Sequence, residues 1–73
     1  MNKLAQLKIK YNELIKTTKR LEEYFDKVSS KEGEKKLPEF KVVLENITRT
    51  LEELEQLGCI FTKEEALEGF KES

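Results

Sequence analysis

Acidic side chains between residues 45 and 55 are the first candidates for chemistry, because clustered carboxylates can bind metal ions or transfer protons. Glu52, Glu53 and Glu55 lie close together, and Glu45 precedes them by one or two helical turns. Di-iron sites in helical bundles, however, use a Glu-x-x-His motif, and this chain contains no histidine. Acid–base catalysis also needs a pocket that shifts a carboxyl pKa. We therefore interpret these residues as a solvated acidic face, and we predict no catalytic residue, no metal site and no cofactor.

Cys59 is the single cysteine of the chain and the second candidate. A nucleophilic or redox-active cysteine needs a nearby base, a cationic group or a helix N-terminus, whereas Cys59 follows Gly58 at the predicted C-terminus of a helix. We therefore interpret it as a small apolar packing residue. Because one cysteine cannot form an internal disulfide, the sequence fits a reducing compartment, and we expect a cytoplasmic protein. We expect no membrane association, because no stretch approaches the roughly 18 apolar residues of a spanning helix.

Basic side chains are concentrated near the N-terminus. Residues 1–28 contain seven basic and four acidic residues, a net charge of +3, while residues 39–57 contain two and five, a net charge of −3. Such a basic helix could contact the phosphates of RNA or DNA in a small dimeric bundle, and the candidate residues are Lys8, Lys16, Lys19 and Arg20. Because several glutamates interrupt the basic residues, we regard nucleic-acid binding as an alternative function.

These side chains must be positioned by helices. The chain has 73 residues, of which 40% are charged and 37% apolar, so one small domain is expected. Apolar residues in the first part recur at alternating steps of three and four, the period of an amphipathic helix. This pattern predicts a helix over residues 3–29, with an inward row formed by Leu4, Leu7, Tyr11, Leu14, Thr18, Leu21, Phe25 and Val28.

The same spacing resumes after a connection over residues 30–37, where Gly33 could supply the left-handed backbone that ends a helix. A second helix is predicted over residues 38–57, with Pro38 in its first turn. Its main row consists of Leu37, Phe40, Leu44, Ile47, Leu51 and Leu54, and its flanking row of Val43, Thr50 and Leu57. Thr62 and Glu65 then form a capping-box pattern, which predicts a short third helix over residues 63–71.

Two helices joined by a short connection fold back on each other, so the predicted fold is all-α: an antiparallel two-helix hairpin with a short C-terminal helix. This arrangement sets Phe25 near Val43, and Tyr11 opposite Gly58. The first helix is longer than the second, so its first turns need cover from the C-terminal segment. The apolar residues available for this cover are Ile60, Phe61, Leu67 and Phe70.

A lone hairpin leaves apolar surface exposed, and large exposed patches usually mark an interface. We therefore favour two hairpins that pair into a four-helix bundle with coiled-coil-like seams, a homodimer, over a monomer closed by the C-terminal segment. The expected function is a non-enzymatic protein–protein interaction or regulatory module that binds another copy or a helical protein partner, with no small-molecule substrate. The predicted interface residues are Ile15, Tyr24, Leu44, Ile47, Leu51 and Leu54.

Overall fold

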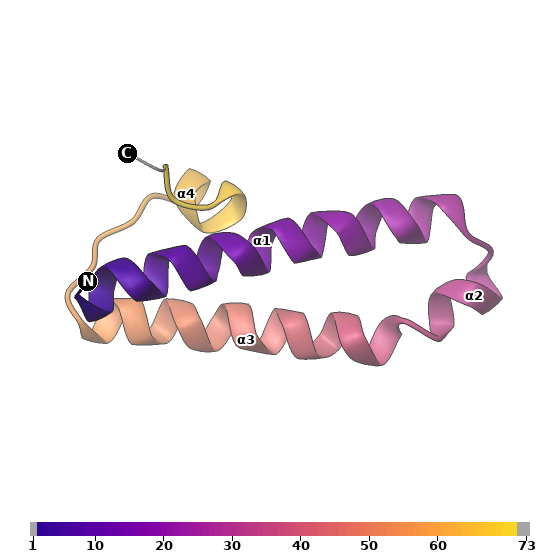
Figure 1. Cartoon of the computed structure of the whole chain (residues 1–73), viewed down its shortest axis with the longest axis horizontal. Helices are drawn as coiled ribbons and strands as arrows, with labels where there is room; N and C mark the ends of the chain where they lie inside the picture. The colour runs from indigo at the N-terminus through magenta and orange to yellow at the C-terminus, as the bar shows by residue number, and fades with distance from the viewer. Residues whose placement is uncertain (1, 72–73) are drawn as a thin grey trace.

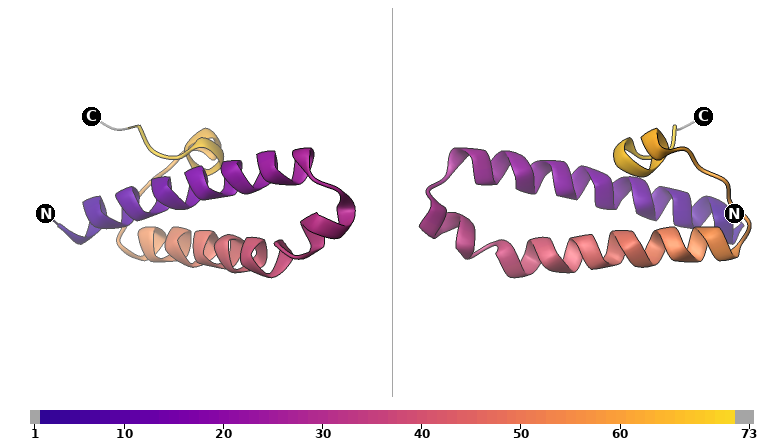
Figure 2. Two further views of the ribbon diagram at one scale, coloured as in Figure 1. Left: turned by 45° about the vertical axis from the view of Figure 1, so that its right-hand side comes forward. Right: turned by 180° about the vertical axis from the view of Figure 1, so that it is seen from behind.

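The computed structural model describes residues 2–71, and every regular element in that range is a helix. The elements are α1 (Lys3–Lys27), α2 (Ser30–Glu34), α3 (Leu37–Gln56) and α4 (Lys63–Glu68). The all-α class predicted from the sequence is therefore confirmed. Helices α1 and α3 pack side by side and run in opposite directions, while α4 lies against α1 (Figures 1 and 2). The molecule is elongated, with a longest extent of 42 Å.

Helix α1 ends two residues before the predicted boundary because a new helix begins there. Val28 is extended, and the Ser29 hydroxyl accepts a hydrogen bond from the backbone N–H of Glu32. Serine three residues before glutamate is a helix N-terminus signal. The predicted connection over residues 30–37 thus contains the short helix α2, which was not predicted from the sequence.

Gly33 does not end a helix, contrary to the expectation from the sequence. It lies inside α2, and the glycines with positive φ in the described range are Gly58 and Gly69. A Cβ on Gly33 would lie 3.3 Å from Cδ1 of Phe25, so the missing side chain permits close packing. Phe25 in turn meets Phe40 edge to face, with ring centroids 5.4 Å apart. These rings close the α2 end of the molecule, one helical turn from the expected partner Val43.

The opposite end is closed by the turn after α3. Helix α3 ends at Gln56, and Gly58 has φ +81° while the N–H of Cys59 donates to the carbonyl of Leu54 at 3.0 Å. An added Cβ on Gly58 would have no heavy atom within 4 Å. The expected packing of Gly58 against Tyr11 is therefore wrong, because the glycine serves the left-handed turn and not a close approach.

The buried face of α3 is rotated from the predicted main row toward the flanking row. Val43, Thr50 and Leu54 are buried, whereas Leu37 and Leu44 are exposed. The buried hydroxyl of Thr50 donates to the carbonyl of Asn46 at 2.7 Å, so it needs no partner from α1. Two apolar residues of the predicted main row consequently remain at the surface.

Helix α4 begins as predicted and ends early. The Thr62 side chain accepts from the N–H of Glu65, and the Glu65 carboxylate accepts from the N–H of Thr62, so the capping box is present. The helix stops at Glu68 because Gly69 adopts φ +94°. Over residues 2–71, no helix has the combination of length and hydropathy needed to cross a bilayer.

Candidate interaction surface

Residues 59–71, which we call the arm, are held on the first half of α1 by polar contacts. The side-chain amide of Asn12 donates to the carbonyl of Phe70 at 2.9 Å and accepts from the N–H of the same residue at 2.7 Å. The hydroxyl of the adjacent residue, Tyr11, donates to the carbonyl of Ala66. These contacts satisfy backbone groups of the arm that lie beyond regular helical hydrogen bonding, so they fix the position of the arm.

The ring of Phe70 completes the hydrophobic core from the arm side. Phe70 is 8% exposed and belongs to one buried cluster with residues of α1 and α3. Its ring meets Tyr11 edge to face at a centroid distance of 5.6 Å and Phe61 at 6.2 Å. The ammonium group of Lys8 lies 5.3 Å from the Phe70 centroid, a cation–π geometry. Burial in this cluster raises the pKa of Tyr11 above its ordinary value of 10.0.

The cover expected from the C-terminal segment is therefore only partly correct. Phe61 and Phe70 pack on the core, but Ile60 is 94% exposed and Leu67 is 64% exposed. Leu67 lines a shallow hollow beside Ile15 and Thr18 of α1. The arm thus buries one apolar side and presents another to solvent.

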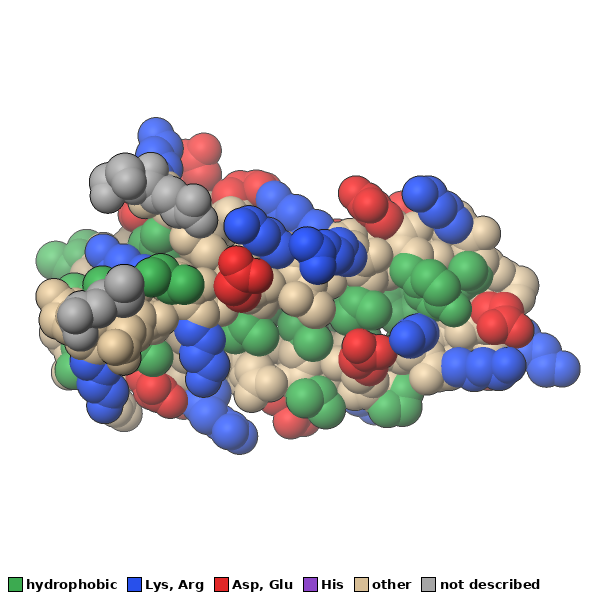
Figure 3. All heavy atoms as spheres, in the orientation of Figure 1, with side chains coloured by type: hydrophobic (Ala, Val, Ile, Leu, Met, Phe, Trp, Pro, Cys, Tyr) green, Lys and Arg blue, Asp and Glu red, His purple; other side chains and the backbone are tan. Residues whose placement is uncertain are grey.

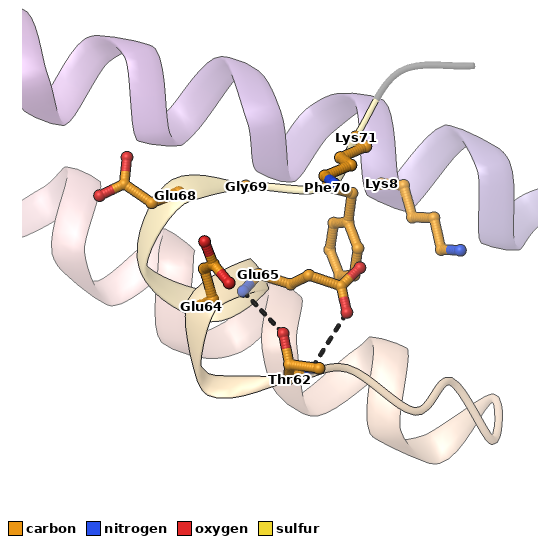
Figure 4. A pocket seen from close by; sticks show the side chains of 8 residues that line it. All are labelled: Lys8, Thr62, Glu64, Glu65, Glu68, Gly69, Phe70 and Lys71. Carbon is orange, nitrogen blue, oxygen red and sulfur yellow. Dashed lines mark hydrogen bonds between the residues drawn. The ribbon is translucent and has the colours of Figure 1, made fainter.

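A hollow of about 620 Å³ lies between Lys8, α4 and the end of the arm (Figure 4). Its walls carry Glu64, Glu65, Glu68 and Lys71, and the Phe70 ring lies at its back. The Glu65 carboxylate is already engaged in the capping box. In the range 2–71, no group of three or more His, Cys, Asp or Glu side chains is arranged to hold a metal ion. The side chains around the hollow therefore carry charges of both signs, and they do not form a set of ligands for one metal ion.

The acidic residues considered for metal or acid–base chemistry are dispersed over α3. Glu45 and Glu52 flank Leu44 along a shallow surface groove with Thr48 and Arg49. Glu55 is exposed and Glu53 is half-buried. Cys59 is a free, half-buried thiol that packs against the core at the start of the arm. The positions of these residues agree with the interpretation of a solvated face and a packing cysteine.

Three of the four basic residues considered for nucleic-acid contacts lie close to an acidic partner or an aromatic ring. Lys19 Nζ lies 2.5 Å from Glu68 Oε2 of the arm, and Lys16 Nζ lies 3.7 Å from Glu13 Oε1. Lys8 lies over the Phe70 ring, and Arg20 is exposed. The acidic arm thus neutralises part of the positive surface of α1.

The six predicted interface residues divide between core and surface. Leu54 is 0% exposed and Ile15 is buried, so neither offers surface to a partner, and both stabilise the chain itself. Ile47 and Leu51 are partly buried against the same core.

Tyr24 and Leu44 are the remaining two members of this set. Tyr24 is half-buried beside Phe25, and the ammonium group of Lys36 lies 6.0 Å from its ring centroid. Leu44 is 42% exposed. Of the six residues, Leu44 therefore offers the clearest apolar surface to a partner.

Leu44 belongs to an apolar row along one side of α3, which we call the α3 edge. Leu37, Leu44 and Leu51 follow one another at intervals of seven residues, so they share one face of the helix. Leu37 and Leu44 are exposed and Leu51 is half-buried. Apolar side chains also reach the surface along the seam between α1 and α3 on the face shown in Figure 3, flanked by charged side chains of both signs. The surface of the two packed helices therefore carries its exposed apolar side chains in rows.

Sequence reasoning missed the part of Asn12 in this surface. No motif marks an asparagine that pairs with a distant backbone, and its partner Phe70 is 58 positions away. Gly69 did carry a signal, because glycine commonly follows the last residue of a helix.

No family model matches the chain, and no curated protein or solved structure shows significant similarity to it.

Proposed function

We propose that this chain is a non-enzymatic, cytoplasmic interaction module that pairs with a second copy to form a four-helix bundle. The observation that supports this proposal is the α3 edge, where Leu37 and Leu44 are 45% and 42% exposed at heptad spacing. Leucines at this spacing are typical of helix–helix seams. Leu67 of the arm adds a further exposed apolar side chain beside α1.

Charge complementarity favours a second copy as the partner. Residues 1–28 carry +3 and residues 39–57 carry −3. In a two-fold symmetric pair, a surface on one copy meets a second surface on the other, and the same contact occurs twice. The α3 edge of each copy then lies against α1 and Leu67 of the other, so the acidic helix faces the basic one. Glu45 and Glu52, which flank Leu44, are placed to meet this basic helix.

The exposed apolar area of each copy determines how stable the proposed dimer is expected to be. Full burial of a leucine side chain stabilises by about 1.5–3 kcal/mol, so the exposed parts of Leu44 and Leu67 contribute about 1 kcal/mol each per copy. Loss of translational and rotational freedom opposes association by several kcal/mol. A weak dimer that forms with increasing concentration is therefore expected.

Light scattering and sedimentation across a concentration series test the proposal with two matched variants. Leu44→Glu places a charge on the α3 edge and is expected to keep the chain monomeric at every concentration. Val42→Glu is the control, because Val42 is 55% exposed on the same helix but lies on a different face, and this variant is expected to dimerise as the wild type does. A wild-type chain that stays monomeric at millimolar concentration, or equal behaviour of both variants, would contradict the proposal.

The alternative, nucleic-acid binding through the basic helix, has weaker support. Lys8 and Lys19 contact the arm, and Lys16 lies near Glu13. Phosphate binding would have to displace these contacts.

A further inference from the structure

We infer that the two copies of the proposed dimer exchange their arms, so that each arm docks on α1 of the other copy. This inference rests on the proposed function, because exchange requires two copies that meet. Tyr11 and Asn12 bind the backbone of the arm, and Phe70 fills the core. Any arm of the same sequence satisfies these contacts, including the arm of a second copy. Exchange of an identical element is a low-cost route to a dimer.

The segment that joins α3 to α4, which includes the start of the arm, is suited to act as a hinge. Residues 58–62 form no helix, and they lie between the end of α3 and the first residue of α4. Gly58 has φ +81° and open space where a side chain would lie. Glycine accepts a wide range of backbone angles, so Gly58 can change its backbone conformation more readily than another residue would. Extension of the hinge away from its own α1 leaves helices α3 and α4 intact, but it removes Cys59 and Phe61 from the core of their own chain, and the exchanged arm restores this packing on the second copy.

Ile60 favours exchange over an arm that remains on its own chain. With its side chain 94% exposed, Ile60 is the most exposed large apolar residue between residues 2 and 71. In a symmetric exchange the two hinges cross between the copies, and Ile60 of one hinge packs against Ile60 of the other. Removal of a large aliphatic side chain from water shifts an equilibrium by about tenfold or more, and a chain whose arm stays on its own α1 leaves Ile60 exposed.

In the proposed dimer, the docking site for the arm on its own α1 lies close to the equivalent site on α1 of the second copy. Leu67 of the arm shares a hollow with Ile15 and Thr18 of α1, and this is the side that meets the α3 edge of the second copy in the proposed dimer. The arm then finds its own α1 and that of the partner at similar effective concentration, which is in the millimolar range for short connections.

The ion pair between Lys19 and Glu68 gives a direct test, because it joins α1 to the arm at 2.5 Å. The double variant Lys19→Glu/Glu68→Lys keeps an attractive pair whether its arm docks on its own chain or on a second copy of the variant. A mixed dimer of wild type and double variant behaves differently if arms are exchanged, because two lysines then meet at one site and two glutamates at the other. The two chains are refolded together, one of them labelled with nitrogen-15, and the dimers are counted by native mass spectrometry at low ionic strength.

If the arms are exchanged, we expect the mixed dimer to make up about one fifth of all dimers. Random pairing of the two chains would give one half. Each exposed pair shifts an equilibrium by less than about twofold, and the loss of two attractive pairs with the gain of two like-charge pairs combines to about fourfold. The single variants Lys19→Glu and Glu68→Lys, refolded together, predict the opposite change, to about four fifths. Mixed dimers at one half in both experiments would overturn exchange and leave the proposed dimer intact. Samples without any dimer would overturn the proposed function itself.

A measurement on the wild type alone gives an independent readout. In a dimer of one isotopically labelled and one unlabelled copy, exchange places the Tyr11 ring of one copy against the Phe70 ring of the other, with centroids 5.6 Å apart as in the single chain. An isotope-filtered nuclear Overhauser effect between these rings is expected. Its absence in a sample that is dimeric by sedimentation would refute the exchange.

Discussion

Gly69→Ala is expected to detach the arm from α1, whereas the same change at Gly58 is expected to leave the arm docked. Gly69 has φ 94° and ψ 169°, a region that is nearly exclusive to glycine and costs other residues about 1–3 kcal/mol. An added Cβ would also lie 2.8 Å from Oδ1 of Asn12. The Asn12 amide must then move, and its two hydrogen bonds to Phe70 weaken, at about 1 kcal/mol each.

The total cost of docking the Gly69→Ala arm is therefore about 4 kcal/mol. At Gly58 the left-handed backbone alone costs about 1–2 kcal/mol, because an added Cβ has no heavy atom within 4 Å. Hydrogen exchange of the amides of residues 63–71 measures the opening of the arm directly. The expected acceleration is about a thousandfold in Gly69→Ala and about tenfold in Gly58→Ala, while amides in the middle of α1 keep their protection in both.

A double-mutant cycle separates backbone strain from the clash. In an Asn12→Ala background the side chain that the new Cβ meets is absent, so the additional cost of Gly69→Ala should decrease by about 2 kcal/mol. Equal acceleration of arm exchange in Gly58→Ala and Gly69→Ala, or a cost of Gly69→Ala that is unchanged by Asn12→Ala, would refute the docking of Phe70 and Gly69 against Asn12.

Other substitutions test the core, the tyrosine and the basic helix. Leu54→Ala removes a side chain that is 0% exposed and should lower the free energy of unfolding by about 2–5 kcal/mol in urea titrations, whereas Leu44→Ala at the α3 edge should cost less than about 1 kcal/mol. Burial raises the pKa of Tyr11 in the folded chain above its ordinary value of 10.0, so its contribution to stability is present below that value and is lost as pH rises through the raised pKa. A Tyr11→Phe variant should lack this alkaline loss in thermal melts recorded from neutral to strongly alkaline pH. Because Lys16 and Lys19 of α1 lie near acidic partners, fluorescence titration with single-stranded RNA should show only weak binding at physiological salt, and tight binding that falls steeply with ionic strength would favour the alternative function.

The two long helices could be predicted from the sequence because their apolar spacing repeats over several turns. The capping box of Thr62 and Glu65 was equally readable, because both partners lie within three residues of each other. Local signals of this kind need no knowledge of the tertiary structure. The short helix α2 had such a signal at Ser29, but its five residues carry no apolar period, so the segment looked irregular.

The rotation of α3 and the docking of the arm could not be predicted in the same way, because they depend on contacts between residues far apart in the chain. The spacing placed Thr50 in the flanking row, and a hydrogen bond to the preceding turn allows this polar residue to be fully buried. Asn12 has no sequence signal for its pairing with Phe70. Which of two adjacent apolar rows faces inward is decided by such long-range contacts and not by periodicity.

When one chain folds alone, apolar side chains of the arm and of the α3 edge remain exposed. Association of two chains would account for these exposed side chains. Phe70 covers the side of α1 that bears Ile15, and α3 turns Val43, Thr50 and Leu54 inward. Leu37 and Leu44 are then left in water at heptad spacing, beside glutamates, in a molecule whose other long helix is basic. The exposed parts of these leucines add little to the stability of the single chain, and they favour association. A second copy with the same acidic and basic helices is the partner whose surface complements both the leucines and the charges.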